Sequence, residues 1–419
     1  MGFSQGLSGL NASSKSLEVI GNNIANANTV GAKTSRAEFA DVYANALGGT
    51  ANNVGIGVSV AAVAQQFTQG TITATDNPLD IAINGGGFFE VKNPAGAVSY
   101  TRNGQFKVDR DGFIVNNQAQ QLLGYPADAA GTIIPGAAGP LQMPTGGITP
   151  AVTTTIGMEM NLDARLGVTL PAAGAPIDFA DPSTYNNATS QTVYDAKGEG
   201  VALTYYFQKA SSDTWNVYIA ANGTPIATSG GNPAASTTIT FPSNGGAPTA
   251  PAGTVAINVP AVTNAAGATS VPISGIALDV SQATQYGSQF GVTDLAQDGY
   301  AAGQLIGVQF EDNGVVMARY SNGETRPAGQ IEIASFRNPQ GLQPLGGNGW
   351  AQSFASGDPL VGVPGDGNFG VLQAGAVEES NVDLTAELVN MITAQRSYQA
   401  NAQTIKTQDQ ILQTIVNLR

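Results

Sequence analysis

The sequence predicts an α+β fold, mainly β, in which a coiled-coil-like helical domain formed by both chain ends joins two nested antiparallel β domains. Three observations predict this fold. Apolar residues recur at heptad spacing at both ends, apolar residues alternate along the chain between them, and a central segment has a distinct composition. We expect these parts: a terminal helical domain in 1–30 and 377–419, an extended linker in 31–70, a middle β domain in 71–147 and 287–376, and an inserted outer β domain in 148–286.

The N-terminal segment is predicted to form an amphipathic helix. Apolar or small residues recur at alternating spacings of four and three: Phe3, Leu7, Leu10, Ser14, Leu17, Gly21 and Ile24. The run Gly21-Asn22-Asn23 weakens the helix, and Gly31 is expected to end this region.

The C-terminal segment predicts a longer helix, because neither Gly nor Pro interrupts residues 382–419. Ser380 followed by Asp383 resembles a capping box, and Glu387 adds negative charge near the helix N-terminus. The same three-four spacing continues along the helix through Leu384, Leu388, Met391, Gln395, Tyr398, Ala402, Ile405, Asp409, Leu412 and Val416.

A second apolar stripe on this helix favours a subunit of an assembly. It consists of Val389, Ile392, Ile411, Ile415 and Leu418. If the helix paired with only one partner, this stripe would stay exposed, and exposed apolar surface of that extent marks an interface. We therefore expect the two ends to pack on each other and on neighbouring copies, and to be largely disordered before assembly. The alternative is a pair of amphipathic helices packed on an ordinary core.

The segments between the helices predict antiparallel β structure. Asp109-Arg110-Asp111-Gly112 separates two short apolar runs and is expected to turn a hairpin. Alternating residues on both sides of Asn313-Gly314 predict a second hairpin, half buried.

The segment 148–286 differs in composition from the rest. No charged residue occurs between Asp213 and Asp279. Two runs with a period of two, at 201–207 and 215–219, predict buried strands, and a weaker alternation follows at 255–259. These strands favour an inserted β domain over disorder, which the Ala, Thr, Gly and Pro content alone would favour.

Composition excludes several functional classes. The charged fraction is 11% and the net charge is −14, which argues against nucleic acid and against an anionic membrane surface. The chain has no cysteine and no histidine, so thiol nucleophiles, imidazole bases and zinc sites with nitrogen or sulfur ligands are absent. No apolar run approaches the roughly 18 residues of a transmembrane helix, and the first residues lack the pattern of a cleaved signal peptide.

The sequence contains no complete catalytic or ligand-binding motif. Gln120 stands where a calcium loop starting at Asp109 would need a glutamate. Gly85-Gly86-Gly87 is not followed by the Lys-Ser/Thr of a phosphate loop, and a bend between strands explains it better. No pair of carboxylates stands out as a glycosidase pair. We therefore expect no enzyme activity, no cofactor and no metal.

Four blocks of residues carry a resemblance to the bacterial flagellar rod and hook axial proteins, and to the hook proteins in particular. They are 8–12 with 19–26 (Ser-Gly-Leu-Asn-Ala and Val-Ile-Gly-Asn-Asn-Ile-Ala-Asn), 77–89, 100–106 and 380–401. The resemblance covers nearly the whole chain outside the insert. Ala32 departs from the family, which commonly has an aromatic residue after Val30-Gly31.

The resemblance implies a structural subunit that polymerises helically into a short curved tube, a universal joint between rod and filament around an export channel. It implies rod subunits as partners at the proximal end, hook–filament junction proteins and a hook cap protein at the distal end, and export by the flagellar type III apparatus. The expected location is the extracellular flagellum, reached without a cleaved signal peptide. The low charge of the insert suggests that outer domains slide past each other when the tube bends.

Two sets of residues follow as candidates. The expected subunit interface consists of Phe3, Leu7, Leu10, Leu17, Ile24, Leu384, Leu388, Met391, Tyr398, Ile405, Leu412 and Val416. Gln395, Gln399 and Gln403 are spaced by about one helical turn and form a neutral polar stripe that is a candidate channel lining. An ordinary solvated helix face is the alternative for this stripe.

Other functions remain open from the residues. A distal rod subunit shares the terminal blocks but is expected to lack the large insert. A secreted adhesive or carbohydrate-binding β protein would instead have ordered ends and a ligand site.

Overall fold

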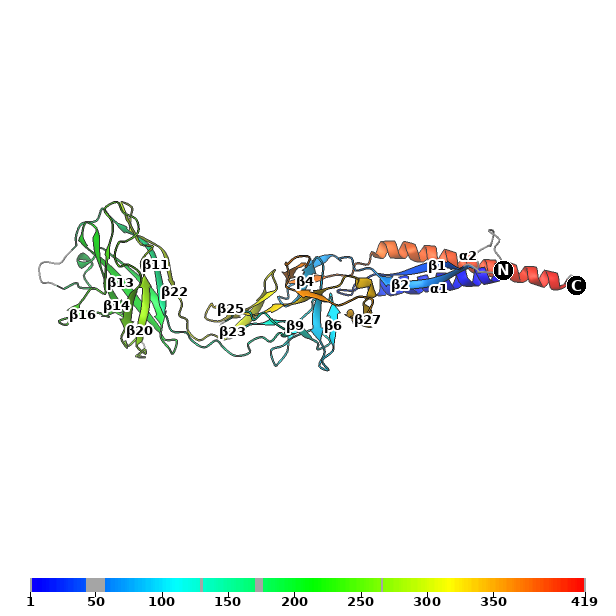
Figure 1. The fold of residues 1–419 in the computed structure, drawn as a ribbon, viewed down its shortest axis with the longest axis horizontal. Coiled ribbons are helices and arrows are strands. Elements are labelled where there is room, and N and C mark those ends of the chain that lie inside the picture. The colour runs from blue at the N-terminus through cyan, green and yellow to red at the C-terminus, as the bar shows by residue number, and fades with distance from the viewer. Residues whose placement is uncertain (1, 43–56, 129–130, 170–175, 265–266, 418–419) are drawn as a thin grey trace. The chain divides into compact units, whose positions relative to one another are not determined.

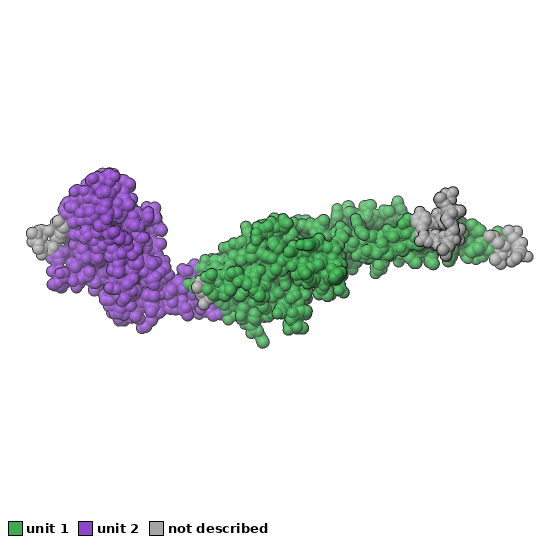
Figure 2. Space-filling view, in the orientation of Figure 1, with its two compact units in different colours: residues 1–145, 307–319, 325–419 green, residues 146–306, 320–324 purple. Residues whose placement is uncertain are grey.

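The computed structural model describes residues 2–42, 57–128, 131–169, 176–264 and 267–417. The chain divides into two compact units, which are coloured separately in Figure 2. Unit 1 consists of Met1–Thr145, Gly307–Arg319 and Thr325–Arg419, and unit 2 of Gly146–Ile306 and Tyr320–Glu324. The described residues contain two α-helices and many strands, so the prediction of a mainly β chain with helical ends is confirmed.

The helices belong to unit 1 and run antiparallel, side by side (Figure 1). Helix α1 spans Gly2–Ala25 and helix α2 spans Leu384–Asn417. Asp383 caps α2, because its Oδ1 accepts hydrogen bonds from the backbone N–H groups of Thr385 and Ala386, at 2.9 and 3.1 Å. The predicted capping box, with Ser380 as the cap, was therefore wrong by three residues.

The expected linker in 31–70 contains a β-hairpin that packs along α1. Strands β1 (Ser35–Val42) and β2 (Gly57–Gln65) pair antiparallel from Ser35 opposite Gln65 to Val42 opposite Gly57. Both strands contact α1. The segment is thus a third layer of the helical part rather than an extended connection.

The rest of unit 1 is β structure. One large sheet contains β5 (Phe88–Lys92), β6 (Val98–Thr101), β7 (Lys107–Val108), β8 (Ile114–Val115), β9 (Gln121–Pro126), β10 (Gly139–Pro140), β23 (Leu305–Phe310), β24 (Val315–Tyr320), β25 (Thr325–Ile331), β26 (Ile333–Ser335), β27 (Gln343–Gly346), β28 (Gly349–Ala351) and β29 (Leu360–Gly362). Two further pairs join distant segments: β3 (Ile72–Ala74) with β31 (Ala376–Glu378), and β4 (Ile81–Asn84) with β30 (Val371–Ala374).

Both predicted hairpins of unit 1 are confirmed. Strands β7 and β8 flank the turn at Asp109, whose Oδ1 accepts hydrogen bonds from the N–H groups of Asp111 and Phe113. Gly112 supplies the positive φ of +87° that this turn needs. Strands β23 and β24 are neighbours in the sheet across Asn313-Gly314. The glycine triplet at 85–87 is a bend between β4 and β5, as expected.

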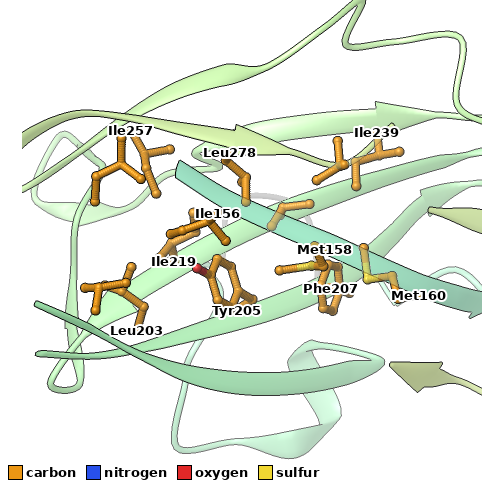
Figure 3. Close-up of a cluster of buried hydrophobic side chains, with 14 of the residues drawn as sticks. Ile156, Met158, Met160, Leu203, Tyr205, Phe207, Ile219, Ile239, Ile257 and Leu278 are labelled. Carbon is orange, nitrogen blue, oxygen red and sulfur yellow. The ribbon is translucent and has the colours of Figure 1, made fainter. Parts of the chain in front are cut away.

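Unit 2 encloses its own hydrophobic core between two sheets (Figure 3). One sheet contains β11 (Thr155–Asp163), β19 (Val255–Val259), β20 (Ile273–Asp279), β21 (Thr284–Tyr286) and β22 (Gly291–Gln297). The other contains β12 (Asn187–Tyr194), β13 (Gly200–Ser211), β14 (Thr214–Ala221), β15 (Thr224–Pro225) and β18 (Thr237–Thr240), and β16 (Thr228–Ser229) pairs with β17 (Asn232–Pro233). Alternate residues of β11 and β13, such as Met158 and Tyr205, are buried between them.

Unit 2 corrects two expectations. It is not purely antiparallel, because β11 pairs in parallel with β20 and with β21. The long intervening chain makes the crossovers that parallel pairing requires. Its end also lies later than residue 286: β22 pairs antiparallel with β11, so residues 287–306 belong to unit 2 rather than to the middle β domain.

Candidate assembly surface

Helices α1 and α2 approach closely because α1 presents glycines to α2. A Cβ atom at Gly6 would lie 3.0 Å from Cγ1 of Ile405, and one at Gly9 would lie 2.8 Å from Nδ2 of Asn401. The buried side chains on this face of α1 are Val19, Ile20 and Asn23. The inward face of α1 is therefore small and partly polar over its first half and apolar only near its end.

Asn23 links three segments of unit 1. Its Nδ2 donates hydrogen bonds to the Ser35 carbonyl at 2.8 Å and to Oε1 of Glu387 at 3.2 Å, and its Oδ1 accepts one from the Ser35 N–H at 2.9 Å. Asn23 is 3% exposed. This asparagine, in the motif 19–26, thus fixes the end of α1 against the start of β1 and the first turn of α2.

A buried ionic cluster fixes the other side of the same junction. The Glu378 carboxylate accepts from Lys33 Nζ at 2.6 Å, from Arg102 at 3.0 Å and from the Gly70 N–H at 2.8 Å. The side chains of Lys33 and Glu378 are fully buried and that of Arg102 is 5% exposed. Burial lowers the pKa of Lys33, while the charge of Glu378 opposes this effect. The cluster ties the segments that follow α1 and precede α2 to the β structure.

Asn381 completes this junction. Its Oδ1 accepts a hydrogen bond from the Thr34 N–H at 2.7 Å, and its Nδ2 donates to the carbonyls of Gln66 and Thr68. The single side chain of Asn381 thereby joins the residue before β1, the residues after β2 and the segment before α2.

The predicted interface residues are mostly uncovered in the single chain. Exposed are Phe3 (49%), Leu7, Leu384, Leu388 (51%), Tyr398 and Leu412, while Leu10, Leu17, Ile24, Met391 and Ile405 are half-buried. The side chain of Val416 lies outside the described part of the chain. Gln395, Gln399 and Gln403 are all exposed. The structure brings Ile405 against α1 but leaves the Phe3–Leu7 face of α1 turned away from α2.

The sequence reasoning missed the inward face of α1. Gly6 and Gly9 are three residues apart, a spacing that lets helices approach, but only the larger residues of the stripe were singled out, because glycine adds no apolar signal. Asn23 and Asn401 carry no apolar signal, although each lies in a motif of the family resemblance.

A groove of about 640 Å³ lies between α1, the β1–β2 hairpin and α2. Small residues such as Ala12 and Ser16 of α1 and Ala394 of α2 line its walls. Among the residues the structure describes, three that line the groove also carry an enclosed polar atom without a hydrogen-bond partner: Thr34 Oγ1, Gln66 Nε2 and Glu387 Oε2. The groove walls are thus mainly apolar, and these three polar atoms are enclosed behind its surface.

Within the ranges described above, no cluster of three or more acidic side chains could hold a metal ion. Neither described helix has the length and apolar content to span a lipid bilayer.

Family models match the chain in four places. A model described as flagella basal body rod protein matches residues 5–33, and one described as flagellar hook protein FlgE/F/G D1 domain matches 82–170. The flagellar basal body protein FlaE D2 domain matches 161–300, and the flagellar basal body rod FlgEFG protein C-terminal model matches 373–418. Terminal helices joined to nested β units and these matches define the class: an axial protein of the bacterial flagellum.

Full-length relatives give the narrower family. The chain is 43% identical over 421 residues to the flagellar hook protein FlgE of Salmonella typhimurium and 42% identical to that of Escherichia coli, with 100% of both chains covered in each case. The chain belongs to the family of flagellar hook proteins. The crystal structure of the Helicobacter pylori flagellar hook protein FlgE2 has the same fold, with a TM-score of 0.52 and 16% identity, over 73% of this chain and 100% of that one.

Proposed function

We propose that this chain polymerises helically into the flexible curved tube of the hook, connects rod to filament and encloses the export channel, with a structural rather than a catalytic role. The observation that carries this proposal is the uncovered apolar face of the terminal helices, which includes Phe3, Leu7, Leu384 and Leu388. Contiguous exposed apolar surface marks a site where another surface binds. A contact that joins two different faces of one chain and does not close gives a helical polymer.

Electron microscopy of the purified protein, under conditions that induce polymerisation, tests this proposal. Wild type is expected to form tubes, and Leu388→Asp is expected to form none, because the new carboxylate would have to lose its water in the interface. Thr228→Asp adds the same charge at an exposed position of unit 2 and serves as the control. Tubes from Leu388→Asp at the wild-type yield would contradict the proposal.

We further propose that α1 and α2 form a coiled-coil-like wall that orders on assembly. The wall residues are those of the predicted interface, and an isolated helix of this composition is marginal in water. Hydrogen exchange should show fast exchange of 2–25 and 384–417 in the monomer and strong protection in the tube. Equal protection in both states would contradict this step.

The channel lining is proposed to include Gln395, Gln399 and Gln403. All are exposed on α2, and a neutral amide surface neither binds nor repels an unfolded chain in transit. Replacing the three with leucine should slow export of filament subunits, whereas replacement with serine should not. Unchanged export in the leucine variant would remove the stripe from the channel.

The partners are proposed from the family. They are rod subunits at the proximal end, hook–filament junction proteins and a hook cap protein at the distal end, and the type III apparatus that exports the chain without a cleaved leader. Unit 2 favours a hook over a distal rod subunit, because the D2 model matches within it. Pull-down of each candidate with tube ends checks the assignment.

Bending is proposed to depend on unit 2, whose stretch between Asp213 and Asp279 has no charged residue. Contacts without ion pairs can slide at low cost. Replacing residues 146–306 with a flexible linker should leave a tube that forms but is straighter or stiffer. Normal curvature in that variant would contradict this part of the proposal.

A further inference from the structure

We infer that the side chains of Lys33 and Asn381 condense into an amide bond within one chain, with Glu378 carrying protons between them. The bond joins Nζ of Lys33 to Cγ of Asn381 and releases the amide nitrogen of Asn381. Its place is the junction between the segment that follows α1 and the segment that precedes α2. The inference goes beyond the proposed function, because the reaction needs the folded junction of one chain and no second copy.

One backbone carbonyl brings the two reacting side chains together. The Thr68 oxygen accepts hydrogen bonds from Nζ of Lys33 at 2.8 Å and from Nδ2 of Asn381 at 3.1 Å. Cγ is bonded directly to Nδ2, so a short movement of the flexible Lys33 side chain brings the amine to the carbon that it attacks. Groups held together in this way react as if each were present at a very high concentration.

Glu378 is placed to take a proton from Lys33. Its Oε1 accepts the hydrogen bond from Nζ at 2.6 Å, and both side chains are fully buried. A lysine is a nucleophile only as the free amine, which burial and a neighbouring cation both favour. Burial lowers the pKa of Lys33, and Arg102 shares the same carboxylate at 3.0 Å. The cluster therefore holds two cations on one anion, and of these two only the lysine can lose its proton.

The carbonyl group of Asn381 is held for the attack. Its Oδ1 accepts a hydrogen bond from the Thr34 N–H at 2.7 Å, which stabilises the negative charge that forms on this oxygen. Asn381 is half-buried, so the nitrogen that leaves has a path to water. The burial of Lys33 and Glu378 excludes water from the other side of the reacting carbon.

The reaction balances without a further reactant. Glu378 takes a proton from the ammonium of Lys33, and the free amine attacks Cγ of Asn381. Glu378 then passes protons from the attacking nitrogen to Nδ2, the Cγ–Nδ2 bond breaks, and ammonium leaves. One ammonium and one carboxamide thus become one secondary amide and one ammonium ion, and Glu378 ends as the carboxylate. The surplus cation of the buried cluster is removed, which leaves Arg102 paired with Glu378.

The bond closes nearly the whole chain into a loop. It joins residues 33 and 381, between which lie unit 2 and the β structure of unit 1. A cross-link across a longer loop restricts the unfolded chain more strongly. The junction that carries both helices therefore becomes harder to unfold once the bond has formed.

Mass spectrometry tests the bond, on the purified chain and on its tubes after incubation for several days. The linked chain should be lighter than its sequence mass by one ammonia. Trypsin should not cut after Lys33 and should release one peptide that joins 16–36 to 338–396. Lys209 is the internal control and should form no linked peptide, because it is also buried but its Nζ donates to two backbone carbonyls.

Two substitutions should abolish the bond. Lys33→Met removes the nucleophile and leaves the Arg102–Glu378 pair intact, so this variant should fold and keep its full sequence mass. Glu378→Gln keeps both reacting groups but cannot carry the protons, and it should also stay unlinked. Lys15→Met, at an exposed lysine paired with Glu18, is the matched control and should lose one ammonia as wild type does.

The outcomes decide the inference separately from the proposed function. The linked peptide in wild type, together with its absence from Lys33→Met and Glu378→Gln, supports the bond. Wild type at its full sequence mass overturns the inference, as does loss of ammonia from a chain that trypsin still cuts after Lys33. A linked peptide from Glu378→Gln overturns the role given to Glu378. Tube formation is measured independently, so each of these results leaves the proposed function to its own test.

Discussion

Two carboxyl groups of unit 1, those of half-buried Glu90 and buried Glu332, are cross-strand neighbours. Antiparallel pairing of Ile333 with Phe89 places Glu332 opposite Glu90 where β5, β9 and β26 meet. Glu332 is 3% exposed, and Oε2 of each carboxyl is buried without a hydrogen-bond partner in the described ranges. Burial first, and then the charge of Glu90, raises the pKa of Glu332 to about 7; burial also raises the pKa of Glu90. Tyr100, opposite Glu90, has its pKa raised as well and supplies no positive charge.

The direction of the resulting pH dependence follows from linkage. In the unfolded chain the carboxyl of Glu332 titrates near its usual value of 4.5, whereas in the folded chain it keeps its proton up to a pKa of about 7. The folded state therefore binds more protons between these values, and the free energy of unfolding falls as pH rises through this window. One pKa unit corresponds to about 1.4 kcal/mol, so the loss at pH 8 is about 3 kcal/mol.

Glu332→Gln should remove this loss. Glutamine is neutral at every pH, so the variant should be more stable than wild type by about 2–3 kcal/mol at pH 8 and nearly equal at pH 5. The chain has two tryptophans, Trp350 in the core of unit 1 and Trp215 in that of unit 2. Urea unfolding followed by Trp350 fluorescence in a Trp215→Phe background therefore reports unit 1 alone.

Glu379→Gln, at an exposed carboxyl of unit 1, is the control and should show no such pH-dependent gain. An equal gain for Glu332→Gln at pH 5 and pH 8 would show that the carboxyl does not titrate in this window. A loss of stability at pH 8 would show that an ionised Glu332 is favourable, and either result refutes the reasoning.

Three further changes test unit 1. Glu378→Gln should lower the free energy of unfolding by about 3–5 kcal/mol, because Lys33 and Arg102 would stay buried without their carboxylate. An unshifted Trp350 urea midpoint would contradict this, and the Trp215 midpoint of unit 2, measured in a separate Trp350→Phe background, is the control. Gly104→Ala should cost about 3 kcal/mol in the same assay, because its Cβ would overlap the Ile81 carbonyl oxygen; Gly136→Ala, where no atom lies within 4 Å, should cost far less. Asp383→Ala should cost about 1 kcal/mol through loss of the α2 cap, measured as a higher critical concentration for tubes; Asp383→Asn should recover most of it.

The periodicity of the sequence predicted most of the elements. Uninterrupted helix formers after residue 382 led to α2, and period-two runs at 201–207 and 215–219 led to β13 and β14. The two strands are visible in sequence because one face of each is buried in the core of unit 2, whereas α2 is visible through its uninterrupted helix formers. The two hairpins were visible because Asp-Gly and Asn-Gly supply the backbone angles of tight turns.

Other features depend on contacts that no local pattern encodes. The parallel pairing of β11 with β20 joins residues more than a hundred positions apart, and nothing in either strand specifies its direction. The end of unit 2 was misplaced because β22, at 291–297, is largely exposed and carries no strong alternation. Buried ions such as Lys33 and Glu378 escaped notice, since charged residues are expected outside.

For the same reason, the sequence predicted only part of the candidate site. The sequence marked Phe3, Leu7 and Leu388 as interface residues, because large apolar residues at heptad spacing form a stripe. It did not mark the groove between α1, the β1–β2 hairpin and α2, because small residues and amides carry no hydrophobic signal. Gly9 and Asn23 acquire a role only when α2 and β1 are placed beside them.

The arrangement of these two surfaces bears directly on how copies would join. Asn23 and Glu387 hold α1 and α2 so that the groove opens between them, while the Phe3–Leu7 face of α1 lies on the other side of the same helix. A contact from this face to a different surface of the next copy would leave each added copy with an open face. Such a contact has no internal reason to stop at a dimer. A two-fold contact between identical faces would instead bury both stripes in a closed pair and end growth.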